Sequence, residues 1–397
     1  MYEKVPKWKE ECGIYGVYSP TEDVSEMTYL GLFALQHRGQ ESKGTVFQTT
    51  IDSEVFVHLI ARSQKATIEE RILETAQKVR GAFCLTIMTE NKLIGVRDPQ
   101  GFRPLCIGRT EEGGWVLSSE TCALDVNGAS FVRDVLPGEM VVVENGTLRS
   151  YRFTNGQDVA SCIFEYIYFA RPDSIIDGQS VHAARFEMGR VLARESGLRG
   201  DVVISVPDSG TTAATGFAYE TGIPFAEGLI KNRYIGRTFI QPTQKQRDTA
   251  VKLKLSPVRS VVEGKSVIMV DDSIVRGTTS GKIVRLLRNA GAREIHVCIS
   301  SPPITDPCYY GIDTSVRKEL ISATKSLEEI RDFIGADSLH FISIEGLRTC
   351  VPALNPDHMC YACFNNQYPV PEEDAALDVG DAITREQQRL AQRERGM

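Results

Sequence analysis

The sequence predicts an α/β protein with two domains, a layered sandwich of short strands followed by a parallel sheet covered by helices. The chain has 397 residues, of which 42% are hydrophobic, and this length exceeds one average domain. Residues 12–150 alternate short apolar runs with glycines, which is typical of strands joined by turns. The later runs DVVISVP (201–207) and KSVIMVDDS (265–273) are typical of buried parallel strands, and GKIVRLLRNAG (281–291) follows them with a helical pattern.

The polar, turn-rich stretch around residues 145–160 predicts the boundary between the two domains. The first domain is therefore expected over 12–150 and the second over 151–370. Residues 371–397 are heavily charged with a weak helical period, which indicates a solvated C-terminal helix or tail.

Charge and composition exclude several classes of protein. The formal net charge is −7 and no basic block is present, so we expect no nucleic-acid partner. The first residues are charged and no apolar run approaches the length of a membrane span, so we expect no membrane contact and a cytoplasmic location. Ten cysteines in such a chain indicate reduced thiols, a nucleophile or metal ligands rather than a disulfide framework.

The stretch SVIMVDDSIVRGTTSGK, residues 266–282, predicts a phosphate-binding turn. An apolar strand ends at the adjacent carboxylates Asp271 and Asp272, which suit ribose hydroxyls or Mg²⁺ at the carboxyl edge of a sheet. A short loop then opens a helix whose backbone N–H groups suit a monophosphate. The loop residues are Arg276, Gly277, Thr278, Thr279 and Ser280. The alternative is an acidic strand end followed by a capped helix.

Two further segments suit an anionic ligand. The segment SVPDSGTTAA at 205–214 is a second step from strand to turn to helix, where Asp208 and Ser209 are expected at a pyrophosphate and Ser209 also at a metal. The segment 231–247 is polar and rich in Lys and Arg. It is either an exposed basic loop or a lid that brings Lys231 and Arg237 over the substrate.

Together these motifs make the chain resemble the amidophosphoribosyltransferases, which are glutamine-dependent enzymes of de novo purine synthesis. The turn at 266–282 resembles the signature of type I phosphoribosyltransferases, which bind phosphoribosyl pyrophosphate (PRPP). The motifs that carry the resemblance are CGIYGV (12–17), LGLFALQHRGQES (30–42), GVRDPQGFRPLCIG (95–108), FVRDVLPGEMV (131–141), EYIYFARPDS (165–174) and the turn at 268–280.

The resemblance implies the fold, the ligands and the assembly. It implies an N-terminal-nucleophile hydrolase sandwich, the type 2 glutaminase, followed by a type I phosphoribosyltransferase sheet. Mg²⁺ is expected on Ser209, Asp271 and Asp272, with the acidic pair on the ribose of PRPP and the following loop on its 5′-phosphate. Glutamine is the second substrate, AMP or GMP is expected to inhibit at the PRPP site, and the protein is expected to be a homo-oligomer, a tetramer.

For the glutaminase half, the resemblance implies that Cys12 attacks the glutamine amide. Its own α-amino group serves as the base once residues 1–11 are removed as a propeptide. Arg38 matches a family position close to the glutamine site, and Asp52 matches the residue that receives the glutamine α-amino group. A buried packing role is the alternative for Cys12.

The chain departs from the family pattern after Gly44. The family carries a GHxRYST segment and an HNGNL segment there, and neither occurs in the 397 residues. These segments supply the arginine that holds the glutamine carboxylate and the donors of the oxyanion hole. Losing even one oxyanion-hole donor typically costs roughly a hundredfold to a thousandfold in rate. A true deletion and a sequence that omits a natural segment both remain open, and the loss of core strands favours the second.

The cysteines Cys162, Cys308, Cys360 and Cys363 match the ligands of a [4Fe–4S] cluster in one branch of the family. By itself, the C-x-x-C pair of Cys360 and Cys363 is shared by zinc sites and redox pairs. Zinc on four cysteines and unliganded thiols are the alternatives to the cluster.

Three functions remain open at this stage. The first is the glutamine-dependent pentosyltransferase that makes phosphoribosylamine from PRPP. The second is an ammonia-dependent transferase whose glutaminase half is inactive. The third is a non-catalytic PRPP-sensing regulator, which is disfavoured because no basic DNA-binding element is visible in the sequence.

Overall fold

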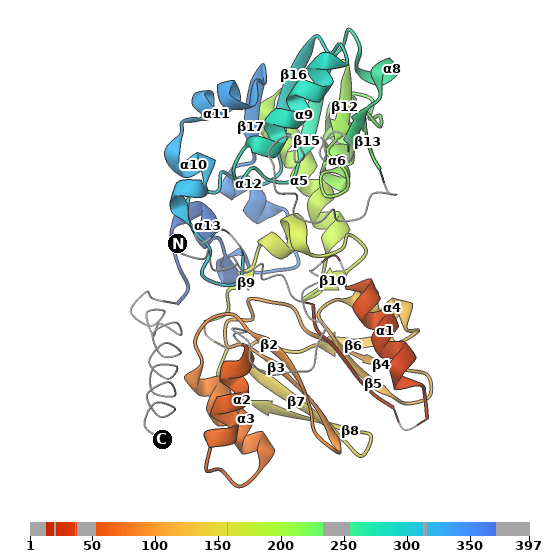
Figure 1. Cartoon of the computed structure of the whole chain (residues 1–397), viewed down its shortest axis with the longest axis vertical. Helices are drawn as coiled ribbons and strands as arrows, with labels where there is room; N and C mark the ends of the chain where they lie inside the picture. Colours follow the sequence, from red (N-terminus) through yellow and green to blue (C-terminus); the bar gives the residue numbers. More distant parts are fainter. Residues whose placement is uncertain are drawn as a thin grey trace, which may run out of the picture.

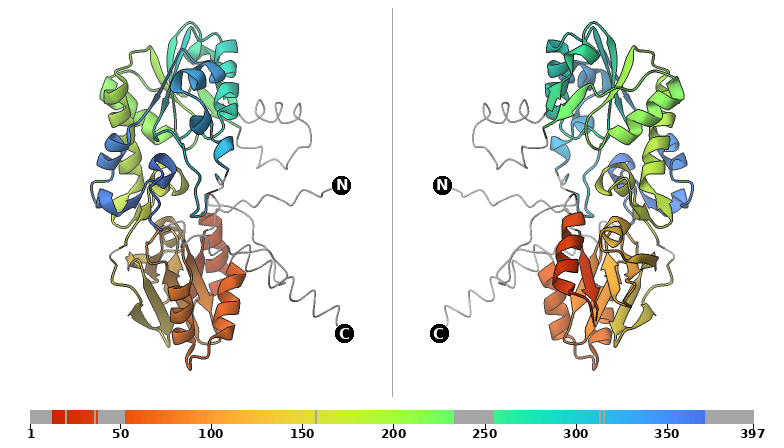
Figure 2. Two further views of the ribbon diagram at one scale, coloured as in Figure 1. Left: turned by 90° about the vertical axis from the view of Figure 1, so that its left-hand side faces the viewer. Right: turned by 90° about the vertical axis from the view of Figure 1, so that its right-hand side faces the viewer.

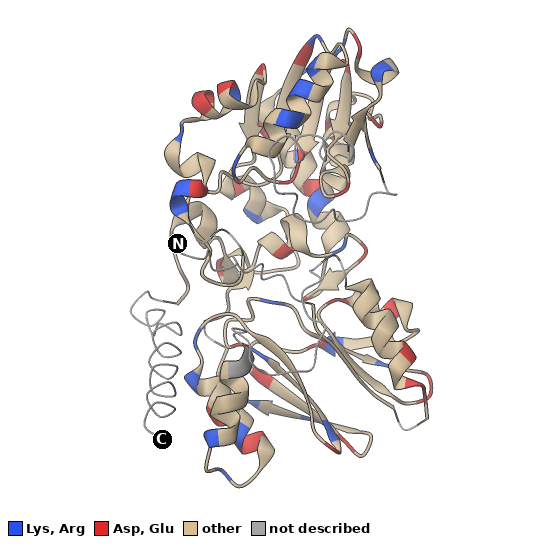
Figure 3. Cartoon of the chain, viewed as in Figure 1, with Lys and Arg blue, Asp and Glu red and all other residues tan. Residues whose placement is uncertain are grey.

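The computed structural model describes two halves stacked along the long axis of the molecule (Figures 1 and 2). The described residues are 13–19, 21–35, 37, 53–156, 158–232, 255–312, 314 and 316–370. Basic and acidic residues are interspersed along the ribbon in both halves (Figure 3). No helix in these ranges combines the length and apolar character needed to cross a membrane.

The N-terminal half contains two antiparallel four-stranded sheets. One sheet has the order β1 (Tyr15–Tyr18), β5 (Trp115–Ser118), β4 (Cys106–Arg109), β6 (Ser130–Asp134). The other has the order β2 (Cys84–Met88), β3 (Lys92–Arg97), β7 (Glu139–Glu144), β8 (Thr147–Arg152).

Helices cover the outer face of each sheet, so this half has four layers. Helices α1 (Val24–Ala34) and α4 (Thr121–Val126) pack on the first sheet, and α2 (Ser53–Arg62) and α3 (Ile68–Lys78) pack on the second (Figure 1). Side chains that alternate along the strands fill the space between the sheets, including Leu105, Ile107, Leu117, Val141 and Val143. This arrangement confirms the predicted sandwich.

Strand β8 runs across residue 150, where the sequence predicts the end of the first domain. The polar residues that suggest a linker instead form a tight hairpin turn. Asn145 and Gly146 both have positive φ, 50° and 71°, the conformation that joins β7 to β8 in two residues. The sandwich therefore continues to Arg152.

The C-terminal half is built on a parallel sheet in the order β12 (Val202–Ser205), β15 (Ser266–Asp271), β16 (Glu294–Ile299), β17 (Ser338–Phe341). Helices α5 (Val181–Ser196) and α6 (Thr211–Thr221) cover one face. Helices α9 (Thr278–Asn289) and α11 (Leu327–Ile334) cover the other (Figure 1). Strands β12 and β15 are buried on both faces, as their continuous apolar runs predict.

Shorter elements surround this sheet. They are β13 (Leu229–Lys231) paired with β14 (Leu255–Pro257), α8 (Arg259–Val262), η3 (Arg317–Glu319), α10 (Ile321–Thr324), α12 (Ile344–Thr349), η4 (Pro356–His358) and α13 (Ala362–Asn365).

The two halves meet at a junction made of short elements. Strand β9 (Ser161–Cys162) pairs with β18 (Met359–Cys360), a π-helical turn η2 spans Glu165–Phe169, and β10 (Ile175–Ile176) forms a hairpin with β11 (Gln179–Ser180). Arg97 at the end of β3 is 1% exposed and donates to both oxygens of Asp177 in this hairpin, at 2.7 and 2.8 Å. An ion pair of this kind ties the sandwich to the junction.

Candidate functional site

The acidic pair lies at the carboxyl end of β15, as the sequence predicts. Asp271 and Asp272 are 7% and 6% exposed. The Asp272 carboxylate accepts hydrogen bonds from the hydroxyl of Ser209 and, at 2.7 Å, from that of Ser273. The N–H of Asp272 donates to Asp271 Oδ1 at 2.9 Å. These contacts bring together two turns that are more than 60 residues apart in the sequence.

Burial and mutual repulsion control the protonation of this pair. Burial raises the pKa of Asp271 well above its usual range, and the neighbouring charge of Asp272 raises it further. Two adjacent buried carboxylates are hard to keep ionised unless a positive charge lies beside them. A divalent cation supplies that charge and binds preferentially to oxygen ligands. The pair is therefore suited to a cation that arrives with a ligand.

The loop after the acidic pair leads directly into the N-terminus of α9. Gly277 is the residue before the helix and has a φ of 71°, and no described side chain caps the first turn. A Cβ atom at Gly277 would lie 2.8 Å from Ile321 Cδ1, so both the backbone conformation and the space favour glycine. Thr278 and Thr279 are exposed and Ser280 is buried. The free N–H groups at the positive end of α9 suit a phosphate.

A second helix N-terminus lies beside the first because β12 and β15 are neighbours in the sheet. Gly210 precedes α6, and a Cβ atom there would lie 2.7 Å from the carbonyl oxygen of Val270, so the two turns pack closely. Asp208 is exposed and pairs with the ammonium of Lys231 on β13. The structure thus brings Asp208, Ser209 and Lys231 to the same sheet edge as the acidic pair.

Arg276 has an ion-pair partner within the protein. Its guanidinium donates to the Glu319 carboxylate at 2.5 and 3.1 Å. This exposed ion pair ties the loop to η3, so a phosphate must compete with Glu319 for Arg276.

The four cysteines predicted as cluster ligands are gathered at the junction. Cys162 on β9 lies opposite Cys360 on the paired strand β18. Burial is the largest cause of the raised pKa of each of these thiols, and the charge of Cys162, Cys308 and Cys360 further raises that of Cys363. Arg103 lowers the pKa of the first three. Within the described ranges, no three or more His, Cys, Asp or Glu side chains form a ready-made site for a single metal ion.

Several predicted residues lie outside the described part of the chain. They are Cys12, Arg38, Asp52 and Arg237, together with the predicted propeptide 1–11, the join after Gly44 and the C-terminal stretch 371–397.

Sequence reasoning missed three buried charged residues at the junction, namely Arg97, Glu120 and Arg185. Arg185 is 3% exposed and stands in the apolar stripe of α5 between Val181 and Met188. A charged residue in such a stripe is a usable sequence signal, because buried charges need dedicated partners. Glu120 carries no comparable signal, since its partners are distant in the sequence.

Comparison with known proteins agrees with this geometry. Residues 35–126 match the model of the glutamine amidotransferase domain, and residues 189–322 match that of the phosphoribosyl transferase domain. The chain is 51% identical to the amidophosphoribosyltransferase of Bacillus subtilis over 353 residues, which covers 85% of this chain and 74% of the relative. The chain belongs to the amidophosphoribosyltransferase family.

A solved member of the family has the same fold. The B. subtilis glutamine PRPP amidotransferase in complex with ADP and GMP superposes with a TM-score of 0.84 at 42% sequence identity, covering 91% of this chain and 98% of that chain. The chloroplastic amidophosphoribosyltransferase of Glycine max is 52% identical over 87% of this chain, but this chain spans only 60% of that protein. This is less than two thirds of the plant relative.

The comparison with the Mycobacterium tuberculosis family member reveals an internal difference in length. The two are 41% identical over 467 positions, which cover 88% of that relative. The 92% of this 397-residue chain that is aligned amounts to about 365 residues. Subtracting 365 from 467 leaves roughly 100 positions of that relative without a counterpart here. This difference in length is consistent with the absence of the segment that carries the GHxRYST and HNGNL motifs in the family.

Proposed function

We propose that the chain is a PRPP amidotransferase, which forms phosphoribosylamine and releases pyrophosphate when ammonia attacks the ribose of PRPP. One observation carries the proposal. The buried acidic pair, the Ser209 turn and the uncapped N-terminus of α9 meet at one edge of a parallel sheet. Each of these three elements suits a different part of a phosphorylated ribose.

Different residues bind different parts of the proposed substrate. Asp271 and Asp272 would accept hydrogen bonds from the ribose hydroxyls and, together with Ser209, would hold Mg²⁺. The turn from Gly277 to Ser280 binds the 5′-phosphate through the N–H groups of α9. The turn at Asp208 and Ser209 lies beside the pyrophosphate. Mg²⁺ neutralises the leaving pyrophosphate when bound.

The nitrogen donor is the point on which two candidate functions differ. Glutamine is the donor implied by family membership, with Cys12 as nucleophile and with Arg38 and Asp52 on the glutamine. The second candidate is a transferase that depends on free ammonium. Two observations favour it: the oxyanion-hole segments are absent from the sequence, and roughly 100 positions of the M. tuberculosis relative have no counterpart here (467 aligned positions against about 365 residues).

The junction thiols are the proposed ligands of an iron–sulfur cluster, but within the described ranges no three of them are arranged as a ready-made metal site. The four cysteines come from three segments, and Cys162, Cys360 and Cys363 are buried whereas Cys308 is half-buried. All cysteines of the described ranges are free thiols, and Cys162 and Cys360 lie opposite each other on paired strands. Cys162, Cys308, Cys360 and Cys363 would hold a [4Fe–4S] cluster, which supplies a redox-active, thiolate-bound centre. Brown protein that contains iron and acid-labile sulfide supports this assignment, and colourless protein with stoichiometric zinc contradicts it.

Purine mononucleotides are the proposed inhibitors. They carry the ribose and 5′-phosphate for which the acidic pair and α9 are suited, and the B. subtilis relative is described in complex with ADP and GMP. A homotetramer is proposed on family membership alone.

Pyrophosphate release from Mg·PRPP tests the function. Release with glutamine and with ammonium indicates the complete amidotransferase. Release with ammonium alone indicates the second candidate. If neither donor supports release although Mg·PRPP binds, the chain is a PRPP-binding protein without this activity.

A further inference from the structure

Within the described ranges, both sheets of the sandwich end on the same side of the molecule in a strand with only one neighbour. There β1 pairs with β5 alone, and β2 pairs with β3 alone. A Cβ atom at Gly16 of β1 would lie 3.0 Å from Leu93 of β3 and 3.5 Å from Thr86 of β2. The edge of one sheet therefore lies over the edge of the other. We call this open side, formed by β1 and β2, the β1/β2 edge.

The hydrogen-bond register shows which backbone groups of β1 point out of the sheet. The N–H of Ser119 donates to the carbonyl oxygen of Ile14 at 3.0 Å, so the backbone of Ile14 faces β5. In an antiparallel pair this direction alternates along the strand. The N–H and C=O groups of Tyr15 and Val17 therefore point away from β5, toward the open side.

Strand β2 presents its backbone in the same way. The N–H of Asp98 donates to the carbonyl oxygen of Phe83 at 3.0 Å, so the backbone of Phe83 faces β3. The same alternation turns the N–H and C=O groups of Thr86 and Met88 away from β3. Both edges thus offer donors and acceptors to a further strand.

The composition of the β1/β2 edge differs from that of the opposite edges of the two sheets. Its strands have the sequences YGVY and CLTIM, which contain neither a charged residue nor a proline. The opposite edge strand β8 carries Arg149 and Arg152, and β6 carries Arg133 and Asp134 and has a register shift in its pairing with β4. Charges and bulges are features that keep natural edge strands from pairing with another chain. In the described sandwich, only the β1/β2 edge lacks them.

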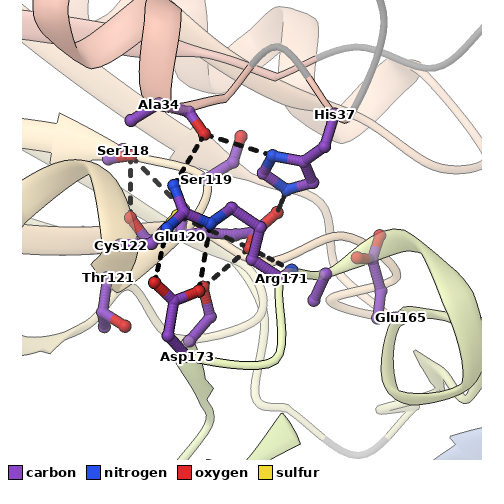
Figure 4. A network of polar contacts seen from close by, with 12 residues as sticks. Ala34, His37, Ser118, Ser119, Glu120, Thr121, Cys122, Glu165, Arg171 and Asp173 are labelled. Carbon is purple, nitrogen blue, oxygen red and sulfur yellow. Dashed lines mark hydrogen bonds and ion pairs between the residues drawn. The ribbon is translucent and has the colours of Figure 1, made fainter. Parts of the chain in front are cut away.

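The junction holds this edge in a fixed position. Helix α1 packs on β1. After the helix, Nε2 of His37 lies 2.6 Å from the buried carboxylate of Glu120, and the Arg171 guanidinium donates to the carbonyl oxygen of Ala34 at 3.4 Å (Figure 4). A preformed edge has less conformational entropy to lose when another strand binds, which favours association.

A second copy of this chain is the occupant that the geometry and the charge favour. Gly16 and Thr86 are the central residues of β1 and β2 and lie against each other, so one two-fold axis normal to the sheets passes by both. This axis pairs the outward groups of Tyr15 with those of Val17 of the second copy, and at the same time pairs β2 with β2. No like charges meet, because both strands are uncharged. The contact is therefore self-complementary.

We propose that the β1/β2 edge is an interface through which two copies of this chain associate, by antiparallel pairing of β1 with β1 and of β2 with β2. The charged edges β6 and β8 disfavour further addition, so the association ends at two copies. The inference does not rest on the proposed PRPP site, which belongs to the other half of the chain.

Size-exclusion chromatography with light scattering, applied to the full-length chain over a range of concentrations, tests the inference. The wild type should associate through this edge. Thr86→Lys should raise the dissociation constant about tenfold or more, because Thr86 lies at the two-fold axis and two like charges then meet. Thr147→Lys is the matched control. It makes the same change on the opposite edge strand of the same sheet and should leave the dissociation constant unchanged.

Val17→Pro is an independent variant that keeps the test decisive if Thr86→Lys does not fold. It removes an outward N–H of β1 without removing a hydrogen bond to β5, and proline is compatible with such an edge position. It should also raise the dissociation constant about tenfold. Leu148→Pro removes an outward N–H of β8 and should not change it. Urea unfolding establishes that each variant is folded.

Three outcomes would overturn the inference. The first is a wild type that shows no association at any concentration. The second is an equal dissociation constant in the wild type and in the folded Thr86→Lys and Val17→Pro proteins. The third is a wild type in which a different polypeptide occupies the edge, visible as a second band on a denaturing gel. Mg·PRPP binding is measured separately, so the proposed function can fail or hold independently of these results.

Discussion

The proposed PRPP site and the junction bury charge in opposite ways. Among the described residues, the hydrogen bonds to the Asp272 side chain come from the neutral hydroxyls of Ser209 and Ser273, and the pKa of Asp271 is raised well above its usual range. At the junction, by contrast, Arg97 has a bidentate carboxylate partner and Glu120 has several donors. Buried charge is left uncompensated where a cationic ligand is expected and is compensated where two domains are joined.

This difference distinguishes a ligand-binding site from an interface that holds two domains together. A compensated buried charge rigidifies its surroundings and is costly to disturb. An uncompensated pair stores unfavourable electrostatic energy that a metal-bound substrate relieves, so it favours binding. The comparison therefore predicts large stability effects at the junction and large functional effects with small stability effects at the acidic pair.

The largest stability effect is expected at Arg97. Arg97→Met should lower the free energy of unfolding by about 3 kcal/mol, because it leaves Asp177 and several backbone carbonyls without their buried donor. Urea unfolding at pH 7 measures the change. The control is Arg293→Met, which breaks an exposed pair with Asp201 and should cost about 0–1 kcal/mol. Equal losses in the two variants would contradict the structural role of the junction pair.

Asp272→Asn is expected to have the opposite effects, a large loss of activity with little loss of stability. It should reduce ammonium-supported pyrophosphate release about a hundredfold or more, because the metal and ribose lose a charged ligand. The unfolding midpoint should stay the same or rise, because repulsion with Asp271 is removed. Asp201→Asn, at the opposite end of the sheet, serves as the control and should keep its activity. A stable, fully active Asp272→Asn protein would show that the acidic pair does not bind the metal and the ribose.

Gly277→Ala tests the phosphate turn, with a smaller expected effect. The positive φ alone should cost about 1 kcal/mol of stability. The contact of the new Cβ with Ile321 should also displace the first turn of α9 and weaken Mg·PRPP binding about tenfold. Isothermal titration calorimetry measures the affinity. Gly264→Ala is the matched control, because Gly264 has the same φ of 71° but open space around its Cβ position. It should lose stability without losing affinity.

The smallest effect is expected from Asp134, beside the junction hairpin. Burial and the charge of Asp177 raise the pKa of Asp134 to about 7, whereas the usual value in an unfolded chain is about 4. The folded state therefore binds this proton more tightly, and the associated stability is lost as pH rises from about 4 through about 7.

Asp134→Asn removes this ionisation. Relative to wild type, the variant should be more stable at pH 8 than at pH 5, by about 1 kcal/mol after allowing for solvent screening. Urea unfolding at the two pH values measures the difference. The exposed carboxylate of Asp125 provides the control variant Asp125→Asn, which should show a smaller change. An identical pH dependence in wild type and Asp134→Asn would contradict the raised pKa.

Local patterns were sufficient to predict much of the fold and the meeting of the Ser209 turn with the acidic pair at one sheet edge. The apolar runs at β12 and β15 indicate buried parallel strands, and the carboxyl ends of neighbouring parallel strands meet at one edge. The proximity of Ser209 to Asp272 follows from this rule, although the two residues are far apart in the sequence. Strand β8 extends past the expected domain boundary, because Asn145 and Gly146 suit a linker as well as a tight turn.

The junction was not predictable from the sequence in the same way. Glu120 meets His37, Arg171 and Ser174 across separations of 83, 51 and 54 residues, and no periodic pattern encodes these contacts. Arg185 is visible as a charge in an apolar helix stripe, but its carbonyl acceptors depend on how the π-helical turn η2 packs. Such contacts depend on tertiary packing rather than on local propensity.

The most direct test of the central claim is titration of the chain with PRPP in the presence and absence of Mg²⁺, for wild type and Asp272→Asn. We expect Mg²⁺-dependent PRPP binding to the wild type that is strongly weakened in the folded variant. PRPP binding of equal affinity with and without Mg²⁺, or in both proteins, would contradict the claim that the uncompensated acidic pair is the metal and ribose site.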